Sequence, residues 1–264
     1  NYLKWCLTMI HPVTVLITGV SSGIGRDTAG DVDERGWNVY SGFRKVSDGE
    51  LLLYDASYRL RTLKLDVTYA GSIEAAIAAI RDGGSGLDAL VNNAGISVNG
   101  PLEFIQLADM RRMFEVNFFG LVAMTQAALP LIRETTGRIV HIGSRSGRHA
   151  LPLIGAYAAT KHAVEAIGEA QRRELSTWGI EVIVIEPGAI ATPMWEKGQD
   201  AAATRQTSRS QREAELYGPA IDAVTARVRG AERGAIGPEE VAKVVETALT
   251  LPRPRPRYLV GKDA

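Results

Sequence analysis

Tyr157 and Lys161 are separated by three small residues in the sequence YAATK. Residues four apart on an α-helix share one face, so the phenol and the ammonium group are expected to lie side by side. A free phenol has a pKa of about 10, and a neighbouring positive charge lowers it. Tyr157 could then exchange a proton with an alcohol or a carbonyl near neutral pH. An isolated Tyr–Lys pair is, however, more often a solvated helix face.

Two further polar residues are candidates for the same site. Ser144 follows the apolar run GRIVHIG, which predicts a strand, and parallel sheets bind ligands at the carboxyl ends of their strands. Its hydroxyl is suited to holding a substrate oxygen beside Tyr157, although a serine in this position is also a common helix N-cap. Asn117 lies within a long apolar helix, where an amide is out of place unless it has a function or caps a kink. Together with Tyr157 and Lys161, these residues predict an active site.

The sequence TGVSSGIG at residues 18–25 lies between the first apolar run and the first amphipathic stretch. Its glycines, Gly19, Gly23 and Gly25, allow a tight turn and a close approach of the backbone to a ligand. The first amides of the following helix could then bind a phosphate group. The spacing is one residue wider than the common dinucleotide fingerprint. Its place at the first strand–helix junction favours a dinucleotide site over an ordinary turn.

Short apolar runs rich in β-branched residues alternate with amphipathic stretches along the chain. Runs that are apolar throughout are typical of strands buried on both faces of a parallel sheet. The alternation predicts an α/β fold with a doubly wound, Rossmann-type, seven-stranded parallel sheet and helices on both faces. The expected strands are 13–18, 37–43, 62–67, 87–92, 137–143, 180–186 and 257–261. The expected helices are 24–35, 46–60, 71–82, 103–133, 155–177 and 238–250.

We expect residues 1–264 to form a single domain, because the length suits one α/β domain and the sequence shows no linker or repeat. Residues 189–236 have no strand pattern and include a small, polar stretch at 200–215. We interpret 189–236 as a substrate loop that orders over a bound ligand, with a solvated pair of surface helices as an equal alternative.

The amino-acid composition narrows the possible binding partners and the cellular compartment. The 30 basic and 30 acidic residues cancel, which argues against nucleic acid or an anionic membrane as a partner. Cys6 is the single cysteine, which suggests a reducing compartment, and the apolar start WCLTMI is too short for a signal sequence or a membrane span. We therefore expect a cytoplasmic protein. His141 and His149 have no carboxylate or cysteine at ligand spacing, so no metal site is expected.

Taken together, these motifs resemble those of the short-chain dehydrogenase/reductase family. The similarity covers residues 13–261, and the motifs are highly specific in this order although each is weak alone. Stretches such as RRELSTWGIEVIVIEPGAIATPMW are most similar to the branch of the family that acts on steroids and retinoids. The matching features are TGVSSGIG, LDV at 65–67, NNAG at 92–95, Asn117, Ser144, Tyr157 with Lys161, and PG at 187–188 followed by Thr192.

The resemblance implies hydride transfer between a nicotinamide cofactor and a secondary alcohol or ketone, and we expect a lipophilic substrate. It implies that Asn117, Ser144, Tyr157 and Lys161 are catalytic, with Asn117 holding a water that links Lys161 to solvent. It also implies a homodimer or homotetramer formed through helix 103–133 and the helix after it. Besides Tyr157 and Lys161, the expected cofactor contacts are Gly19, Ser21, Ser22, Gly23, Ile24, Gly25, Arg44, Asp66, Val67, Asn93, Ala94, Gly95, Pro187, Gly188, Ile190 and Thr192.

NADP is expected in preference to NAD. The second strand ends with Phe43, where related NAD-dependent enzymes place an aspartate, and Arg44 follows directly. No carboxylate is then expected to bind the ribose diol or to repel a phosphate. Arg44, helped by Lys45, suits a 2′-phosphate group. The alternative is a solvated arginine at the end of the strand.

Some features depart from the family pattern or leave alternatives open. The first helix carries Asp27, Gly30, Asp31 and Asp33 where related proteins carry alanine and aliphatic residues, which predicts a cost in stability or cofactor affinity. Arginines at positions 145 and 148 could contact an acidic substrate, although loop arginines are usually solvated. A dinucleotide-sensing regulator without turnover is the alternative that the complete set of catalytic residues disfavours. A reductase of fatty-acyl or sugar carbonyls is an alternative that the sequence does not separate.

Overall fold

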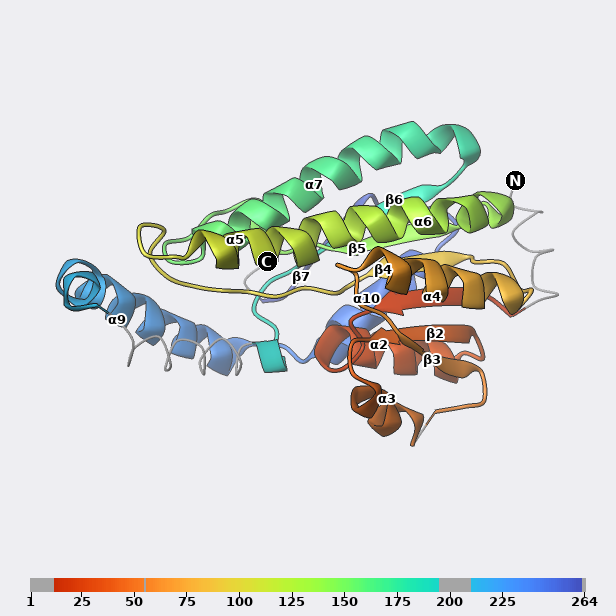
Figure 1. Cartoon of the computed structure of the whole chain (residues 1–264), viewed down its shortest axis with the longest axis horizontal. Coiled ribbons are helices and arrows are strands. Elements are labelled where there is room, and N and C mark those ends of the chain that lie inside the picture. The colour runs from red at the N-terminus through yellow and green to blue at the C-terminus, as the bar shows by residue number, and fades with distance from the viewer. Residues whose placement is uncertain (1–11, 55, 195–209, 263–264) are drawn as a thin grey trace.

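The computed structural model describes residues 12–54, 56–194 and 210–262. Its parallel strands form one sheet in the order β3-β2-β1-β4-β5-β6-β7 (Figure 1). The order reverses between β1 and β4, and doubly wound sheets bind ligands beside such a reversal. The predicted fold class is confirmed. The strands are β1 (Thr14–Thr18), β2 (Asn38–Phe43), β3 (Leu60–Lys64), β4 (Ala89–Asn92), β5 (Arg138–Ile142), β6 (Glu181–Pro187) and β7 (Arg257–Val260).

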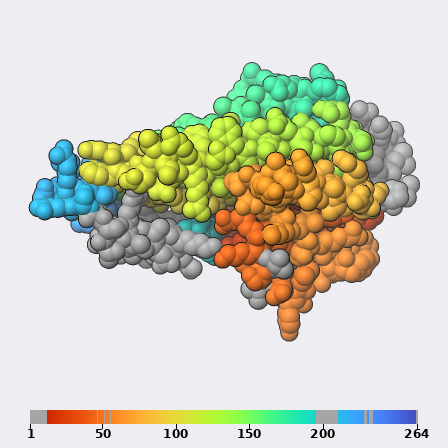
Figure 2. Space-filling view, in the orientation of Figure 1, coloured from red at the N-terminus to blue at the C-terminus, as the bar shows by residue number. Residues whose placement is uncertain are grey.

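Helices cover both faces of the sheet (Figure 1). One face carries α2 (Gly23–Glu34), α3 (Val46–Leu53) and α10 (Pro238–Thr250). The opposite face carries α4 (Ala70–Asp82), α6 (Gly120–Thr135) and α7 (Gly155–Leu175), which form adjacent bands in Figure 2. Two short helices, α5 (Leu107–Phe114) and a 3₁₀ turn at Ser176–Trp178, flank this layer, and α9 (Gln211–Gly234) extends from the end near α5.

Two hydrophobic layers hold the sheet between its helices. Along β1, Val15 and Ile17 point toward α2 and α10, whereas Leu16 points toward α4 and α6. All three side chains are fully buried. Because side chains of a strand alternate between faces, only a strand that is apolar at every position can fill both layers. This explains why the strand segments are apolar throughout.

The long helix predicted at 103–133 is interrupted. It begins at Leu107, passes through a π-helical turn at Glu115–Phe119, and continues as α6. Among the described residues, the run Leu107–Thr135 is long and apolar enough to cross a membrane by length and composition, and 44% of its most apolar window is buried inside the protein. The run packs on α4 and on the sheet, so these contacts in the core explain its apolar character.

Other boundaries also differ from the sequence prediction. The third strand is Leu60–Lys64, earlier than predicted, and the helix predicted at 46–60 ends at Leu53. The segment 189–236 contains α9 and a single bridge between Ile190 and Ile236, while its residues 195–209 lie outside the described part of the chain.

The three aspartates of α2 differ in their surroundings. Asp33 is buried at the end of the helix that lies away from the glycine turn. Its carboxylate accepts hydrogen bonds from the backbone N–H of Ser57 at 2.7 Å and from the Ser57 hydroxyl at 2.6 Å. Asp27 and Asp31 face acidic residues of α10, and burial together with these charges raises the pKa of both carboxyls. Nothing in the structure explains Gly30, since a side chain there would meet no atom within 4 Å.

Candidate active site

The glycine turn at residues 18–25 packs closely against the residues that follow β4. Gly19 has a φ of 71°, and a Cβ there would lie 2.8 Å from the Cα of Ala94. A Cβ on Gly25 would lie 2.6 Å from the carbonyl oxygen of Gly19 and 2.4 Å from Nδ2 of Asn93. That same Nδ2 donates hydrogen bonds to the carbonyls of Thr18 and Gly19, at 2.9 and 2.8 Å. Only glycine fits these two positions, so the turn passes directly beneath the start of α2.

A cavity of about 470 Å³ opens at the carboxyl edge of the sheet, above the glycine turn. Gly25 lies beneath its floor, where it contacts Gly19 and Asn93. The other residues predicted to bind the cofactor all line the cavity: Gly19, Ser21, Ser22, Gly23, Ile24, Arg44, Asp66, Val67, Asn93, Ala94, Gly95, Tyr157, Lys161, Pro187, Gly188, Ile190 and Thr192.

The predicted catalytic residues Ser144, Tyr157 and Lys161 line the same cavity. Tyr157 and Lys161 lie on one face of α7, and the Lys161 Nζ is 5.8 Å from the centre of the Tyr157 ring. Nζ donates a hydrogen bond of 2.8 Å to the carbonyl of Ile142, the last residue of β5. The Ser144 side chain lies close enough to the Tyr157 hydroxyl to lower its pKa. Both side chains line the cavity, where they could hold a substrate oxygen.

Ser144 is a helix cap, which is one of the two interpretations that the sequence allows for this serine. It precedes the 3₁₀ turn Arg145–Gly147, and its Oγ accepts a hydrogen bond of 3.1 Å from the backbone N–H of Ser146. The cap fixes the direction of the hydroxyl, which leaves its hydrogen and remaining lone pair for Tyr157 and a ligand.

The pKa of Tyr157 is shifted in the direction opposite to our prediction. Burial raises it to about 12, although the bond to Ser144 lowers it. Burial also lowers the pKa of Lys161 to about 8. We predicted that the ammonium would lower the phenol's pKa, but in the protein by itself the loss of water around the hydroxyl outweighs that attraction.

Asn117 lies in the π-helical turn and is 2% exposed. Its Oδ1 accepts a hydrogen bond from the backbone N–H of Ile96 at 2.8 Å. Its Nδ2 donates to the Ile96 carbonyl at 2.9 Å and to the Thr160 hydroxyl at 3.1 Å. Both amide hydrogens are therefore used, and the side chain joins the segment after β4 to α7 beside Tyr157 and Lys161.

Comparisons with known proteins agree with this arrangement. Residues 13–203 match the family described as short chain dehydrogenase. The chain belongs to the short-chain dehydrogenase family. It is therefore an oxidoreductase that transfers a hydride between a nicotinamide cofactor and an alcohol or ketone, as the sequence predicted.

Similar members of this family come from distant organisms. Retinol dehydrogenase 7 of Rattus norvegicus is 37% identical over 95% of this chain and 81% of its own length. The NADPH-dependent 3-dehydrocapnine reductase of Ornithobacterium rhinotracheale is 32% identical over 93% and 87%. A short-chain dehydrogenase from Streptomyces avermitilis superposes with a TM-score of 0.80 at 30% identity, covering 96% of this chain and 89% of its own. The retinol dehydrogenase confirms the resemblance to the steroid and retinoid branch.

Arg44 lines the cavity where it passes the carboxyl end of β2. It is exposed, follows Phe43 at the end of β2, and lines the cavity with Lys45. A carboxylate lines the same cavity after all, because Asp48 in the first turn of α3 is among its lining residues. Asp66 lies within electrostatic reach of Arg44. The sequence prediction missed Asp48 because this residue lies five positions after the end of β2. It is the first turn of α3 that brings Asp48 to the cavity.

The remaining polar candidates have structural partners. His141 is fully buried between Asn92 and Gln171, and burial lowers its pKa to about 4, so it is neutral. Arg148 is paired with Glu186 at 2.8 Å, which makes it unsuited to bind an acidic substrate. In the part of the chain that the structure describes, no group of three or more His, Cys, Asp or Glu could hold a metal ion.

Proposed function

We propose that Tyr157 exchanges the proton with the substrate oxygen while hydride moves to or from the carbon beside it. The observation that carries this proposal is that Tyr157, Ser144 and Lys161 line one cavity, with Ser144 close enough to lower the pKa of Tyr157 and the Lys161 ammonium 5.8 Å from the centre of the Tyr157 ring. Ser144 orients the substrate oxygen, and Lys161 supplies positive charge that favours the phenolate. Asn117 fixes the positions of the cavity wall and α7. A bound nicotinamide cofactor would supply or accept the hydride.

NADP(H) is the cofactor that these residues fit best. The glycine turn leaves the first amides of α2 facing the cavity, and the Ser22 side chain makes no capping bond to them, so they suit a pyrophosphate. Arg44 and Lys45 provide positive charge where a 2′-phosphate would lie. The name of the Ornithobacterium relative, an NADPH-dependent reductase, supports the same choice.

A lipophilic alcohol or ketone is the proposed substrate. Tyr157 and Ile96 pack against a buried apolar cluster of Ile105, Met113 and Ala156. The cavity itself is lined by apolar residues that include Ile96, Val116 and Met194, and such a lining favours a hydrophobic substrate over a sugar. The relative named as a retinol dehydrogenase supports this class. We propose that residues 1–264 form a single domain and that residues 189–236 contribute its substrate loop.

The assembly proposed is a cytoplasmic homodimer or homotetramer. A surface groove on the α5–π-turn run is lined by four apolar residues, Leu107, Met110, Phe114 and Phe119, together with Arg111 and Glu115. Leu107 and Phe119 are 63% and 52% exposed. Exposed apolar area of this kind favours a protein contact. Light scattering coupled to size exclusion would measure the assembly, and a monomer at all concentrations would contradict it.

The central test is a screen of lipophilic ketones and alcohols that follows the absorbance of reduced cofactor, with the wild type and Tyr157→Phe. The variant loses only the transferable proton, so we expect turnover to fall by at least about a hundredfold. Its dissociation constant for NADPH should change less than about threefold. Appreciable turnover by Tyr157→Phe at saturating substrate would refute the role of the tyrosine. Absence of turnover with every substrate in the wild type would favour a dinucleotide-sensing protein.

A further inference from the structure

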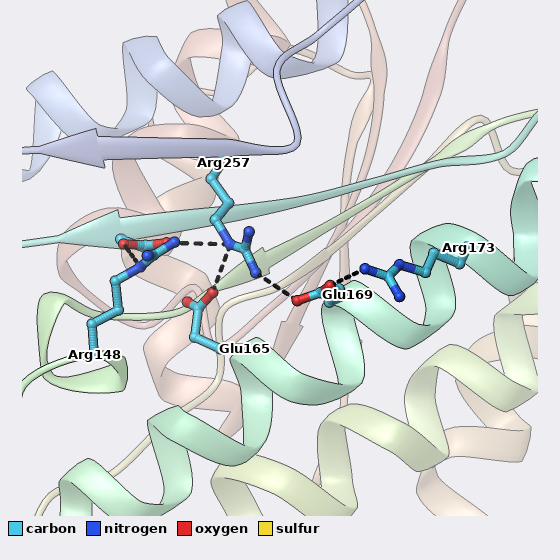
Figure 3. Close-up of polar contacts among 6 residues, drawn as sticks. Arg148, Glu165, Glu169, Arg173 and Arg257 are labelled. Carbon is cyan, nitrogen blue, oxygen red and sulfur yellow. Dashed lines mark hydrogen bonds and ion pairs between the residues drawn. The ribbon is translucent and has the colours of Figure 1, made fainter.

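The face of α7 that carries the catalytic pair continues into a buried ion network. Tyr157, Lys161 and Glu165 follow at intervals of four residues, so they share one helix face. Glu165 is 8% exposed and Glu186 of β6 is 2% exposed. Arg257 of β7 bridges them, with its Nε 3.2 Å from Glu165 Oε2 and 3.6 Å from Glu186 Oε1. Figure 3 shows the guanidinium of Arg257 beside the carboxylate of Glu165.

The outer members of the network are more exposed. A terminal nitrogen of Arg257 is 3.2 Å from Glu169 Oε2, and Glu169 also pairs with Arg173 (Figure 3). The side chains of Glu169 and Arg173 are 38% and 70% exposed. Water therefore screens the charge of Glu169 far more than that of Glu165. The two glutamates share the Arg257 partner but differ in burial and in distance along the helix from Lys161.

One oxygen of Glu165 has no hydrogen-bond partner although it is buried. This oxygen, Oε1, lies directly beneath the loop that carries Ser144: a Cβ on Gly143 would be 2.9 Å from it. A Cβ on Gly147 would be 3.0 Å from Glu165 Cγ and 2.9 Å from the Lys161 carbonyl. Glycine at these two positions lets the carboxylate reach the underside of the active site. A buried carboxylate is costly unless a positive charge is near.

We propose that Glu165 is a positioning residue of this active site, which holds Lys161 as an ammonium ion and is itself anchored by Arg257. The inference rests on the proposed roles of Tyr157 and Lys161. Lys161 is buried and donates only one identified hydrogen bond, to Ile142, so its charge needs a compensating carboxylate nearby.

The other charges around Lys161 do not supply this compensation. His141 of β5 is neutral near pH 7, because burial lowers its pKa to about 4. Glu186 is paired with two arginines, Arg148 and Arg257, whereas Glu165 is paired with Arg257 through one oxygen and keeps the other oxygen without a partner. Burial lowers the pKa of Lys161 to about 8, and the charge of Glu165 opposes that shift. Burial and the charge of Glu186 raise the pKa of Glu165 itself, and the contacts with Arg257 oppose that rise. The titratable groups that face Lys161 or adjoin its partners are Tyr157 and Glu165 of α7, His141 of β5, Arg148 after the 3₁₀ turn, Glu186 of β6 and Arg257 of β7.

The experiment compares Glu165→Gln with the matched control Glu169→Gln. Each substitution removes one carboxylate that binds Arg257, but only Glu165 lies one helical turn from Lys161. The pH dependence of kcat/KM reports the ionisation of the free enzyme. In Glu165→Gln we expect the alkaline loss of kcat/KM to begin about one pH unit lower than in the wild type. Glu169→Gln should keep the wild-type profile, and Glu165→Asp should restore most of it.

A second readout needs no turnover. The NADPH dissociation constant, measured by calorimetry from about pH 6 to about pH 10, should rise where Lys161 loses its charge, because the cofactor is an anion. In Glu165→Gln, this rise in the dissociation constant should occur at lower pH. The shift should equal the shift in the alkaline loss of kcat/KM. If Glu165→Gln does not fold, the double variant with Arg257→Gln removes both charges of the pair and should show the same direction of shift.

Superimposable profiles for the wild type and Glu165→Gln in both measurements would overturn the inference, as would equal shifts in the Glu165 and Glu169 variants. Tyr157→Phe separates this failure from a failure of the proposed function. If Tyr157→Phe is inactive and the profiles superimpose, only the role of Glu165 is wrong. If Tyr157→Phe keeps its activity, the proposed catalytic site itself is wrong.

Discussion

Arg44 is predicted to determine the choice between NADP(H) and NAD(H), and its replacement by alanine is the direct test. A hydrogen bond to a charged group contributes about 1.5–3 kcal/mol. Arg44 is exposed, and the carboxylates of Asp48 and Asp66 are close to it. Water and these negative charges weaken a contact with a phosphate. We therefore expect the lower half of the range, about 1.5–2 kcal/mol, which is about a ten- to thirtyfold preference for NADPH.

The assay is calorimetric titration of the wild type and variants with NADPH and with NADH. Arg44→Ala should weaken NADPH binding by about tenfold and change NADH binding by less than about twofold. Asp48→Asn should strengthen NADPH binding, because it removes a negative charge from the same wall of the cavity. The matched control is Arg81→Ala, an equal change in net charge in the last turn of α4 and outside the cavity.

Three results would refute this reasoning about Arg44. The first is equal dissociation constants for NADPH and NADH in the wild type. The second is an unchanged ratio of the two constants in Arg44→Ala. The third is an equal loss of NADPH affinity in Arg44→Ala and Arg81→Ala, which would show that overall charge, rather than a contact, attracts the cofactor.

Three further changes test the site and its supports. Ser144→Ala should lower turnover by about ten- to a hundredfold, less than the loss expected for Tyr157→Phe, because it removes a positioning hydrogen bond; an unchanged rate would mean that the substrate oxygen is held elsewhere. Asp33→Ala should reduce the free energy of unfolding by about 2–4 kcal/mol through the lost bonds from Ser57, whereas Asp31→Ala should change it by less than about 0.5 kcal/mol; equal losses in urea denaturation would contradict this. Gly25→Ala should abolish detectable NADPH binding in calorimetry, since its Cβ would overlap Asn93 and the glycine turn, and retained affinity would show that the turn can widen.

The fold and most of the cavity wall could be predicted because their signals are local. A strand buried on both faces must be apolar at each position, as Val15, Leu16 and Ile17 are. Parallel strands in turn bring their carboxyl ends to one edge. Residues that follow separate strands, such as Gly19 and Ser144, therefore had to meet there.

What could not be predicted depends on partners that are distant in the sequence. The π-helical turn holds Asn117 against Ile96 and Thr160, and no spacing within the helix indicates those bonds. Asp33 looked unfavourable because its partner, Ser57, lies 24 residues away in the next crossover. Nothing in the sequence singles out Glu165, because its partner Arg257 lies 92 residues later, in β7.

The direction of the Tyr157 pKa shift shows why residue types alone do not set a site's ionisation. The sequence places an ammonium beside a phenol, which predicts a lowered pKa, but burial acts on both groups and opposes both charges. With pKa values of about 12 for Tyr157 and about 8 for Lys161, the free protein near pH 7 holds a neutral phenol and an ammonium. That state already carries the proton that a carbonyl oxygen needs when it is reduced. Oxidation requires the phenolate, so it depends on Lys161 remaining charged as the pH rises, and Glu165 is the carboxylate placed to keep it so.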